Sequence, residues 1–359
     1  MIPQRIGFCC KWLDPVTGNK HDLGTRATTV AWLNRQPRDE AVQRLWDIVD
    51  HNLEATLNLV KRVGEDSHEL RMVRIGSDLL PMYTQSDWGW FYNQPDVQST
   101  LAKGFAEVGR VARALDVRLS FHPGQFCVLA SSNDGIVGRS IEEFEYHVDM
   151  ARWMGYGATW HDHGFKINVH LSGQGGIEKF MSTLGKLTPE ARNLITIEND
   201  EMKYGLDYTL SVSKHVALVL DIHHHWINSG EYILATDDRT KRVMDSWRGT
   251  RPVLHYSVSR EDILVDHCTR TPPDLARLIA GGYKKQHLRA HSDYYWNTGV
   301  NEWALTFRDQ FDIQLESKSK NLAREHFYSQ AKGTADEINE PLWPLVSLEP
   351  LASSELLVS

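Results

Sequence analysis

Short apolar runs rich in β-branched residues alternate along the chain with longer amphipathic stretches. Eight of these runs have the length and composition of buried strands: Arg5–Cys10, Leu70–Gly76, Val117–His122, Lys166–Leu171, Leu194–Glu198, Ala217–Ile222, Pro252–Ser257 and Asp312–Ser317. Strands that alternate with helices form parallel sheets with the helices packed outside them. The pattern therefore predicts an α/β fold, a single (β/α)8 TIM barrel.

The stretches between the predicted strands place apolar residues at helical spacing. Ala41–Val63 repeats leucine, isoleucine and valine every three or four positions. Ser140, followed by Glu143, has the pattern of an N-cap for a helix over Ile141–Gly155. We expect both helices to pack an apolar face on the sheet.

One domain is predicted over residues 1–340, because no fixed-period repeat or Pro/Gly-rich linker divides the chain. A length of 359 residues suits one barrel with insertions. Residues from about 258 to 290 depart from even spacing and are predicted to form an insertion after the seventh strand. Residues 341–359 are predicted to be a C-terminal tail that packs on the barrel.

The composition is that of an ordinary globular protein, with 41% hydrophobic and 24% charged residues. No apolar run of about 18 residues and no signal-peptide pattern is present, so we expect a cytoplasmic protein, associated with the nucleoid in a bacterium, with no membrane contact. A monomer is also expected. The four cysteines lack CxxC spacing and are expected to be reduced. A net charge of −8 argues against a protein that coats nucleic acid. Bound metals would weaken this argument, because about three divalent cations add roughly six positive charges where a phosphate binds.

Histidine or a carboxylate stands at the end of strand after strand. The set is His122, His170, Glu198, Asp221, the run His223-His224-His225, His255 and Glu316. In a barrel all strand carboxyl ends meet at one face, so these side chains converge. Imidazole and carboxylate without thiolate suit Mn²⁺, Zn²⁺ or Fe²⁺, and the number of ligands is too large for one ion. The pattern predicts two or three metals, although any single histidine has the alternative of a hydrogen-bonded rim residue.

Several motifs that occur together connect the chain with a known family. They are Arg5-Ile6-Gly7, Val73-Arg74-Ile75-Gly76-Ser77, His122-Pro123-Gly124-Gln125-Phe126, Asn168-Val169-His170-Leu171-Ser172-Gly173, Glu198-Asn199-Asp200, His291-Ser292-Asp293 and Asp312-Ile313-Gln314-Leu315-Glu316-Ser317-Lys318. The sequence resembles the UV damage endonuclease family over nearly its whole length. That family is similar in fold to the abasic-site endonuclease and xylose isomerase barrels, and its members use a multinuclear site, commonly with manganese. The resemblance implies a DNA repair endonuclease that incises the backbone 5′ to UV photoproducts, with abasic sites as a further class of lesion.

The resemblance also implies a ligand set for two or three divalent ions, with manganese expected first and zinc or magnesium as alternatives. The implied ligands are His122, His170, Glu198, Asp221, His224, His255, His291 and Glu316. Among them, the resemblance implies that Glu198, His122 and Glu316 are catalytic. It favours His224 within the histidine run, where strand periodicity alone leaves the choice open. Val253 stands where some members carry a lysine near the metals, which makes the third metal site the least secure part of the set.

Gln125 and Phe126 are implied to enter the DNA at the lesion. An amide and an aromatic ring replace lost pairing and stacking, and unstacking is cheapest where damage has weakened the helix. The alternative is a turn residue followed by a core phenylalanine. Further predicted DNA contacts are Phe8, Trp12, Lys318 and Lys320. The aromatic segment Ser86–Tyr92 either stacks on bases or packs beneath the rim.

Damaged double-stranded DNA is therefore the expected partner. The alternative enzymes are an abasic-site endonuclease and a sugar isomerase of similar TIM-barrel type. A sugar isomerase needs a closed polyol pocket and has no use for a wedge at Gln125 and Phe126. A barrel that stores or senses metal without chemistry is the alternative from another class of protein.

Overall fold

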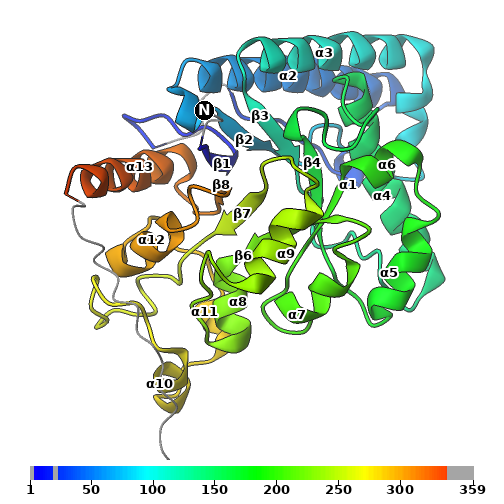
Figure 1. The fold of residues 1–359 in the computed structure, drawn as a ribbon. Helices are drawn as coiled ribbons and strands as arrows, with labels where there is room; N and C mark the ends of the chain where they lie inside the picture. The colour runs from blue at the N-terminus through cyan, green and yellow to red at the C-terminus, as the bar shows by residue number, and fades with distance from the viewer. Residues whose placement is uncertain (1–3, 19–22, 338–359) are drawn as a thin grey trace, which may run out of the picture.

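The computed structural model describes residues 4–18 and 23–337. Eight parallel strands pair in chain order, and β8 pairs with β1 to close the barrel (Figure 1). The strands are β1 Ile6–Cys10, β2 Met72–Ile75, β3 Arg118–Phe121, β4 Lys166–His170, β5 Ile195–Glu198, β6 Ala217–Asp221, β7 Val253–Tyr256 and β8 Asp312–Leu315. Each predicted strand overlaps one of these, and the predicted α/β barrel is confirmed.

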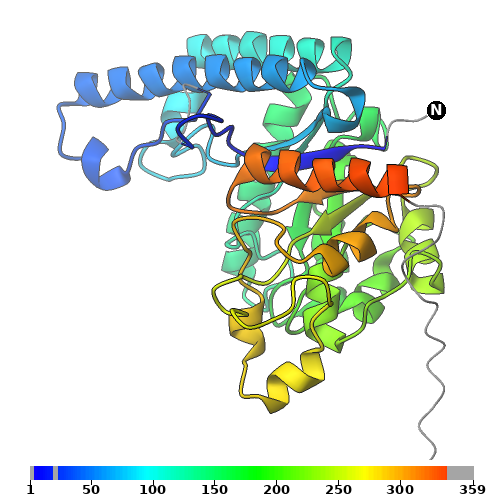
Figure 2. The same cartoon turned by 90° about the vertical axis from the view of Figure 1, so that its left-hand side faces the viewer.

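Helices surround the strands. They are α1 Val30–Leu33, α2 Arg38–Gly64, α3 Pro95–Ala114, α4 Asp134–Trp153, α5 Gly176–Leu184, α6 Pro189–Leu194, α7 Leu206–Thr209, α8 Ile222–Ser229, α9 Asp238–Ser246, α10 Leu275–Ala280, α11 Lys285–Leu288, α12 Thr298–Leu305 and α13 Lys320–Glu337. Short 3-10 helices are η1 His68–Leu70, η2 Gly89–Asn93, η3 Asp162–Gly164 and η4 Leu210–Val212. The long helices α2 and α3 lie side by side along one flank (Figure 2). Among the helices of the described ranges, none combines the length and the apolar character that crossing a bilayer requires.

Burial explains why the strands could be recognised from composition. All five residues of β6 and all four residues of β5 are buried. Strands of a parallel barrel are covered on the outside by helices and on the inside by one another, so they form nearly continuous apolar runs. Polar residues therefore stand out where such a run ends.

The start of α4 differs from the prediction. The helix begins at Asp134, and the side chain of Asn133 caps it by accepting hydrogen bonds from the backbone N–H groups of Gly135 and Ile136, at 2.9 and 3.2 Å. The Ser140 hydroxyl lies inside the helix, where it donates to the Ile136 carbonyl at 2.8 Å. The prediction of Ser140 as N-cap was wrong, because Asn133 already satisfies the free N–H groups nearer the true start of the helix.

A buried charge cluster ties the amino ends of the strands together. Asp312, the first residue of β8, is fully buried and accepts from Arg118 of β3 and from Arg251, each at 2.7 Å. Its Oδ1 also accepts from the backbone N–H of Arg5 at 2.9 Å. The carboxylate thus links segments from both sides of the barrel seam, at the end opposite to the predicted metal ligands.

Residues 258–290, predicted as an insertion, follow β7 and contain α10 and α11, which lie to one side of the barrel (Figure 2). The segment returns beside its own start through an antiparallel bridge between Ser259 and His291. The backbone N–H of Ser292 donates to the Val258 carbonyl at 3.0 Å. This return brings His291 to the carboxyl end of the barrel. The predicted tail, residues 341–359, lies outside the described residues.

Candidate metal centre

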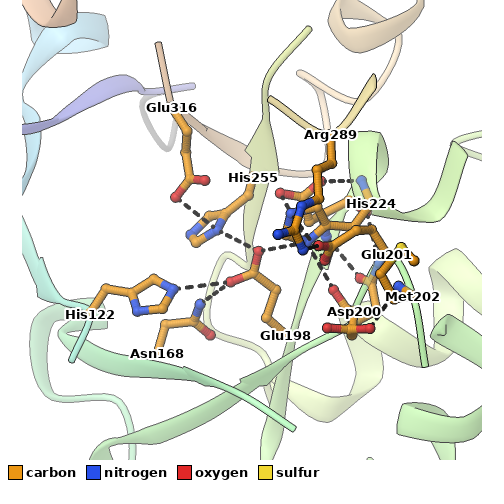
Figure 3. A network of polar contacts seen from close by, with 12 residues as sticks. His122, Asn168, Glu198, Asp200, Glu201, Met202, His224, His255, Arg289 and Glu316 are labelled. Carbon is orange, nitrogen blue, oxygen red and sulfur yellow. Dashed lines mark hydrogen bonds and ion pairs between the residues drawn. The ribbon is translucent and has the colours of Figure 1, made fainter. Parts of the chain in front are cut away.

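Glu198, the last residue of β5, lies at the centre of the carboxyl face and is fully buried (Figure 3). Its Oε2 is 3.4 Å from Nε2 of His122, which directly follows β3. Its Oε1 is 3.2 Å from Nδ1 of His255 in β7 and 3.4 Å from Nδ1 of His224. Nδ1 of His255 also lies 3.3 Å from Oε1 of Glu316, which directly follows β8. Four distant segments therefore meet around one carboxylate.

The end of β6 positions two further predicted ligands. Asp221 is the N-cap of α8, and its Oδ1 accepts from the backbone N–H of His224 at 2.7 Å. This cap places the first turn of α8 directly after the strand and turns the His224 ring inward, where Nδ1 lies 3.6 Å from Asp221 Oδ2. The second oxygen of Asp221 remains directed at the site.

The other members of the histidine run face elsewhere. The His223 ring stacks on Trp226, with ring centroids 5.8 Å apart, and Nε2 of His225 lies 3.2 Å from Oε2 of Glu231. Because the run lies in a helix, successive side chains point about 100° apart. Of the three histidines, His224 is the one placed beside Glu198.

The two remaining predicted ligands border the same centre. His170 ends β4, and its ring centroid is 5.0 Å from that of His122 and 5.7 Å from that of His224. The His291 ring is farther out, with its centroid 6.5 Å from that of His224. The structure thus gathers all eight predicted ligands at one face, with His291 at the edge.

The donor atoms have the arrangement that metal ions require. Two groups of side chains each place one ligand atom within 4.8 Å of the others: His122, His170 and Glu198, and Glu198, Asp221, His255 and Glu316. Four of these side chains have a buried atom that lacks a hydrogen-bond partner among the described residues: His170 Nδ1, Glu198 Oε1, Asp221 Oδ2 and His255 Nδ1. Buried nitrogen and carboxylate atoms without a hydrogen bond are costly, and a cation between them would offset that cost. The residues present therefore fit a cluster of divalent ions, and Glu198 belongs to both groups.

Electrostatics in the cluster reflects burial and crowding of like charges. Burial lowers the pKa of His170 to about 4, so its imidazole is neutral and able to act as a ligand. Burial, with help from the neighbouring carboxylates Glu198 and Glu316, raises the pKa of Asp221 to about 8. Burial also opposes ionisation of Glu198, but the surrounding histidines, above all His255, hold its pKa well below the ordinary value. Bound divalent cations would favour the ionised carboxylates and neutral imidazoles together.

Two residues of the site were quoted in the motifs but not predicted as functional. Asn168 lies two positions before His170, on the same face of β4, and its amide donates to Glu198 Oε2 while its Oδ1 accepts from Thr196 Oγ1 at 3.0 Å. Arg74 of β2 forms a partly buried ion pair with Glu316. The sequence carried a signal for each of these residues. Asn168 shares the period-two spacing of β4 with His170, and Arg74 is a charged residue inside an apolar strand.

A pocket of about 610 Å³ opens from the ligands to solvent. His170, His224, His291 and Glu316 line it together with Gln125. Phe126 is 84% exposed, so it is not a core phenylalanine. Phe126 directly follows Gln125, which lines the pocket, so the exposed ring lies next to the pocket in the chain.

Phe8 and Trp12, predicted as DNA contacts, are buried. Phe8 is fully buried and Trp12 is 5% exposed, and the guanidinium of Arg324 in α13 lies 5.0 Å from the Phe8 ring centroid. Neither ring presents a face to solvent, so we leave both out of the proposed DNA surface. The reason is that α13, from the far end of the chain, covers β1 and the loop that follows it.

Lys318 and Lys320 follow β8 on the ligand face. Lys318 is exposed, with its Nζ 3.5 Å from Asp293 Oδ1, and Lys320 is half-buried at the start of α13.

In the aromatic segment, Trp88, Phe91 and Tyr92 are buried, and Tyr92 donates to the Pro81 carbonyl at 2.6 Å. Packing beneath the rim therefore accounts for most of this segment.

The closed parallel barrel surrounded by helices is a fold that this chain shares with several solved structures. The chain superimposes on a structure titled "Crystal Structure of SacUVDE" with a TM-score of 0.68, 21% identity and coverage of 93% of this chain and 98% of that one. It superimposes on endonuclease IV from Thermus thermophilus with a TM-score of 0.50 and 12% identity, covering 79% of this chain and 94% of that one.

Sequence comparison identifies the family to which the chain belongs. The model of the UV-endonuclease UvdE family matches residues 4–341, and the chain belongs to that family. It is 25% identical over 319 residues to the UV DNA damage endonuclease of Bacillus thuringiensis subsp. konkukian, covering 84% of this chain and 87% of the relative. It is 28% identical over 310 residues to the UV DNA damage endonuclease of Bacillus velezensis, covering 83% and 86%.

Proposed function

We propose that this protein is a metal-dependent DNA repair endonuclease that incises the phosphodiester backbone 5′ to UV photoproducts in duplex DNA. The observation that carries the proposal is the convergence of the ligand set in a pocket that opens beside the exposed Phe126. A reactive centre and a side chain able to replace a damaged base step thus lie on one face. Membership in the UV-endonuclease family supports the same activity.

The proposed ligands hold two or three divalent ions. Mn²⁺ is the first expectation, with Zn²⁺ and Mg²⁺ as alternatives, because the donors are imidazole nitrogens and carboxylate oxygens. When bound, such ions lower the pKa of an attacking water, neutralise the phosphate and stabilise the departing 3′ oxygen. In β7, Val253 has a hydrocarbon side chain that packs in an apolar cluster with Trp247, and a hydrocarbon supplies no ligand atom to a third site.

The remaining roles belong to the side chains themselves. Glu198 is the shared ligand of both groups, and His122 and Glu316 complete the proposed catalytic residues on either side of it. Asn168 fixes one oxygen of the Glu198 carboxylate by donating a hydrogen bond to it. Gln125 lines the pocket and the exposed Phe126 follows it directly; on this proposal both side chains enter the duplex at the lesion and bring the adjacent phosphate to the ligands.

The test is incubation of the protein with Mn²⁺ and supercoiled plasmid, either irradiated or untreated. We expect nicks that depend on irradiation, with ends that map 5′ to the photoproducts. A plasmid with abasic sites tests the second class of lesion. Equal nicking of irradiated and untreated plasmid, or no nicking, would refute the proposal.

Glu198→Gln removes the shared charge while it preserves the shape of the side chain. We expect this variant to stay folded and to lose incision of irradiated plasmid. Glu178→Gln in α5, at an exposed position, is the matched control and should cut as the wild type does. Undiminished incision by Glu198→Gln would contradict the assignment of the centre.

A further inference from the structure

The segment after β7 supplies one wall of the pocket. Gln286 of α11, Arg289 and Ala290 line the pocket opposite residues that follow β3 and β5. Among the described residues that line it, Arg289 is the one arginine or lysine, whereas Asp200, Glu201 and Glu316 contribute carboxylates. A phosphate that enters this pocket therefore meets a single permanent positive charge from the protein.

The backbone on both sides of Arg289 is held firmly. Leu288 is fully buried, and its carbonyl accepts from the Ser259 hydroxyl at 2.6 Å. The carbonyl of Ala290 accepts from the backbone N–H of Arg260 at 3.1 Å. Because the backbone is already ordered, only the side chain of Arg289 has to be ordered when it binds a ligand.

The side chain itself is half exposed and forms an ion pair across the pocket mouth. Nη1 of Arg289 lies 2.8 Å from Oε1 of Glu201, and the Arg289 side chain is 51% exposed. The other oxygen of Glu201 lies 3.8 Å from Nε2 of His224, so the pair borders the ligand set (Figure 3). An ion pair with one partner half in solvent is weak and is easily exchanged for another anion.

We propose that Arg289 is the phosphate-binding residue of the pocket and that it exchanges Glu201 for a backbone phosphate when DNA enters. A guanidinium binds phosphate through two parallel N–H bonds, which makes a stronger contact than its single bond to Glu201. The insertion after β7 thereby takes part in substrate recognition. This inference rests on the proposed endonuclease function.

The alternative role for Arg289 is structural, in which its pair with Glu201 only holds the segment after β7 against the loop after β5. Salt dependence separates the two roles. Each phosphate contact releases condensed counterions, so loss of one contact reduces the slope of log affinity against log salt by about one. A purely structural bond, when lost, weakens binding without that change of slope.

The experiment measures binding of a labelled duplex that carries a UV photoproduct and a phosphorothioate linkage 5′ to it, which slows cutting. Binding is followed by fluorescence anisotropy of the metal-loaded protein over a series of salt concentrations. We expect Arg289→Ala to weaken binding roughly tenfold or more and to lower the salt slope by about one. Arg289→Lys keeps the charge and should retain the slope while it loses part of the affinity. Arg277→Ala, in α10 and outside the pocket, removes an arginine that is 89% exposed and should bind as the wild type does.

A parallel measurement of nicking separates this inference from the proposed function. We expect Arg289→Ala to raise KM for irradiated plasmid more than it lowers kcat. If the wild type nicks irradiated plasmid and Arg289→Ala shows unchanged affinity, or reduced affinity with an unchanged slope, only the role of Arg289 is overturned. A wild type that neither binds nor nicks irradiated DNA overturns the endonuclease function and this role together.

Discussion

Replacing Phe126 with alanine separates the contact with DNA from the stability of the fold. The ring is 84% exposed, so its removal opens no cavity and should change the free energy of unfolding by no more than about 0.5 kcal/mol. In the complex, a ring stacked on a base contributes about 1–3 kcal/mol. At about 1.4 kcal/mol for each factor of ten, kcat/KM for irradiated DNA should fall about 5- to 150-fold.

The assay is initial-rate nicking of irradiated supercoiled plasmid, with thermal denaturation of the same samples. Phe126→Trp keeps a stacking face and should retain most of the activity. Leu234→Ala removes an apolar side chain that is 44% exposed and does not line the pocket, so it should leave the rate unchanged. A Phe126→Ala protein with the wild-type melting temperature and a kcat/KM within about twofold of wild type would refute the proposed wedge, since even the weakest stacking contribution predicts a larger loss.

Asn168→Ala removes a donor to Glu198 and should weaken metal affinity about 10- to 100-fold by titration calorimetry; an unchanged affinity would show that Asn168 does not orient the ligand. Mn²⁺ added to metal-free protein at about 100 times its dissociation constant should stabilise the fold by about 2.7 kcal/mol, and an unshifted melting temperature would argue against the ligand set. Burial lowers the pKa of His147 to about 4, below the value of about 6.5 in the unfolded chain, so stability is retained above pH 6.5 and falls as the pH drops from about 6.5 towards 4. From pH 7 to pH 5, the free energy of unfolding of the wild type should fall by about 2 kcal/mol more than that of His147→Gln, as measured by urea denaturation. Equal losses in the two proteins would contradict this.

The barrel was predictable because its strands are buried on both faces. The run Ala217–Asp221, for example, is fully buried, and it ends in a carboxylate where the apolar pattern stops. Since parallel strands end at one face, recognising that His122, Glu198 and Glu316 end strands was enough to predict that they meet. Which atoms face each other depended on caps and turns, as at Asp221, where an N-cap bond turns His224 inward.

Other features depended on parts of the chain that are distant in sequence. Phe8 resembled an exposed rim residue, but α13 covers it with Arg324. Arg289 lies in the segment between β7 and α12, away from any strand end, so strand pattern alone gave no signal for it. Ser140 carried a capping pattern that the sequence also allows inside a helix, and only the observed bond from its hydroxyl to Ile136 shows which applies.

The two ends of the barrel neutralise buried acidic groups by different means. At the amino ends, Asp312 is balanced by Arg118 and Arg251, which are part of the chain and remain in place under any solution condition near neutral pH. At the carboxyl ends, neighbouring histidines stabilise the ionised Glu198, and on the proposed function divalent ions taken up from solution complete the balance for Glu198 and Asp221. On that proposal, chelation should remove the compensating positive charge from one end while β8 stays paired with β1, and the metal-free protein should then accept one kind of ion at a time.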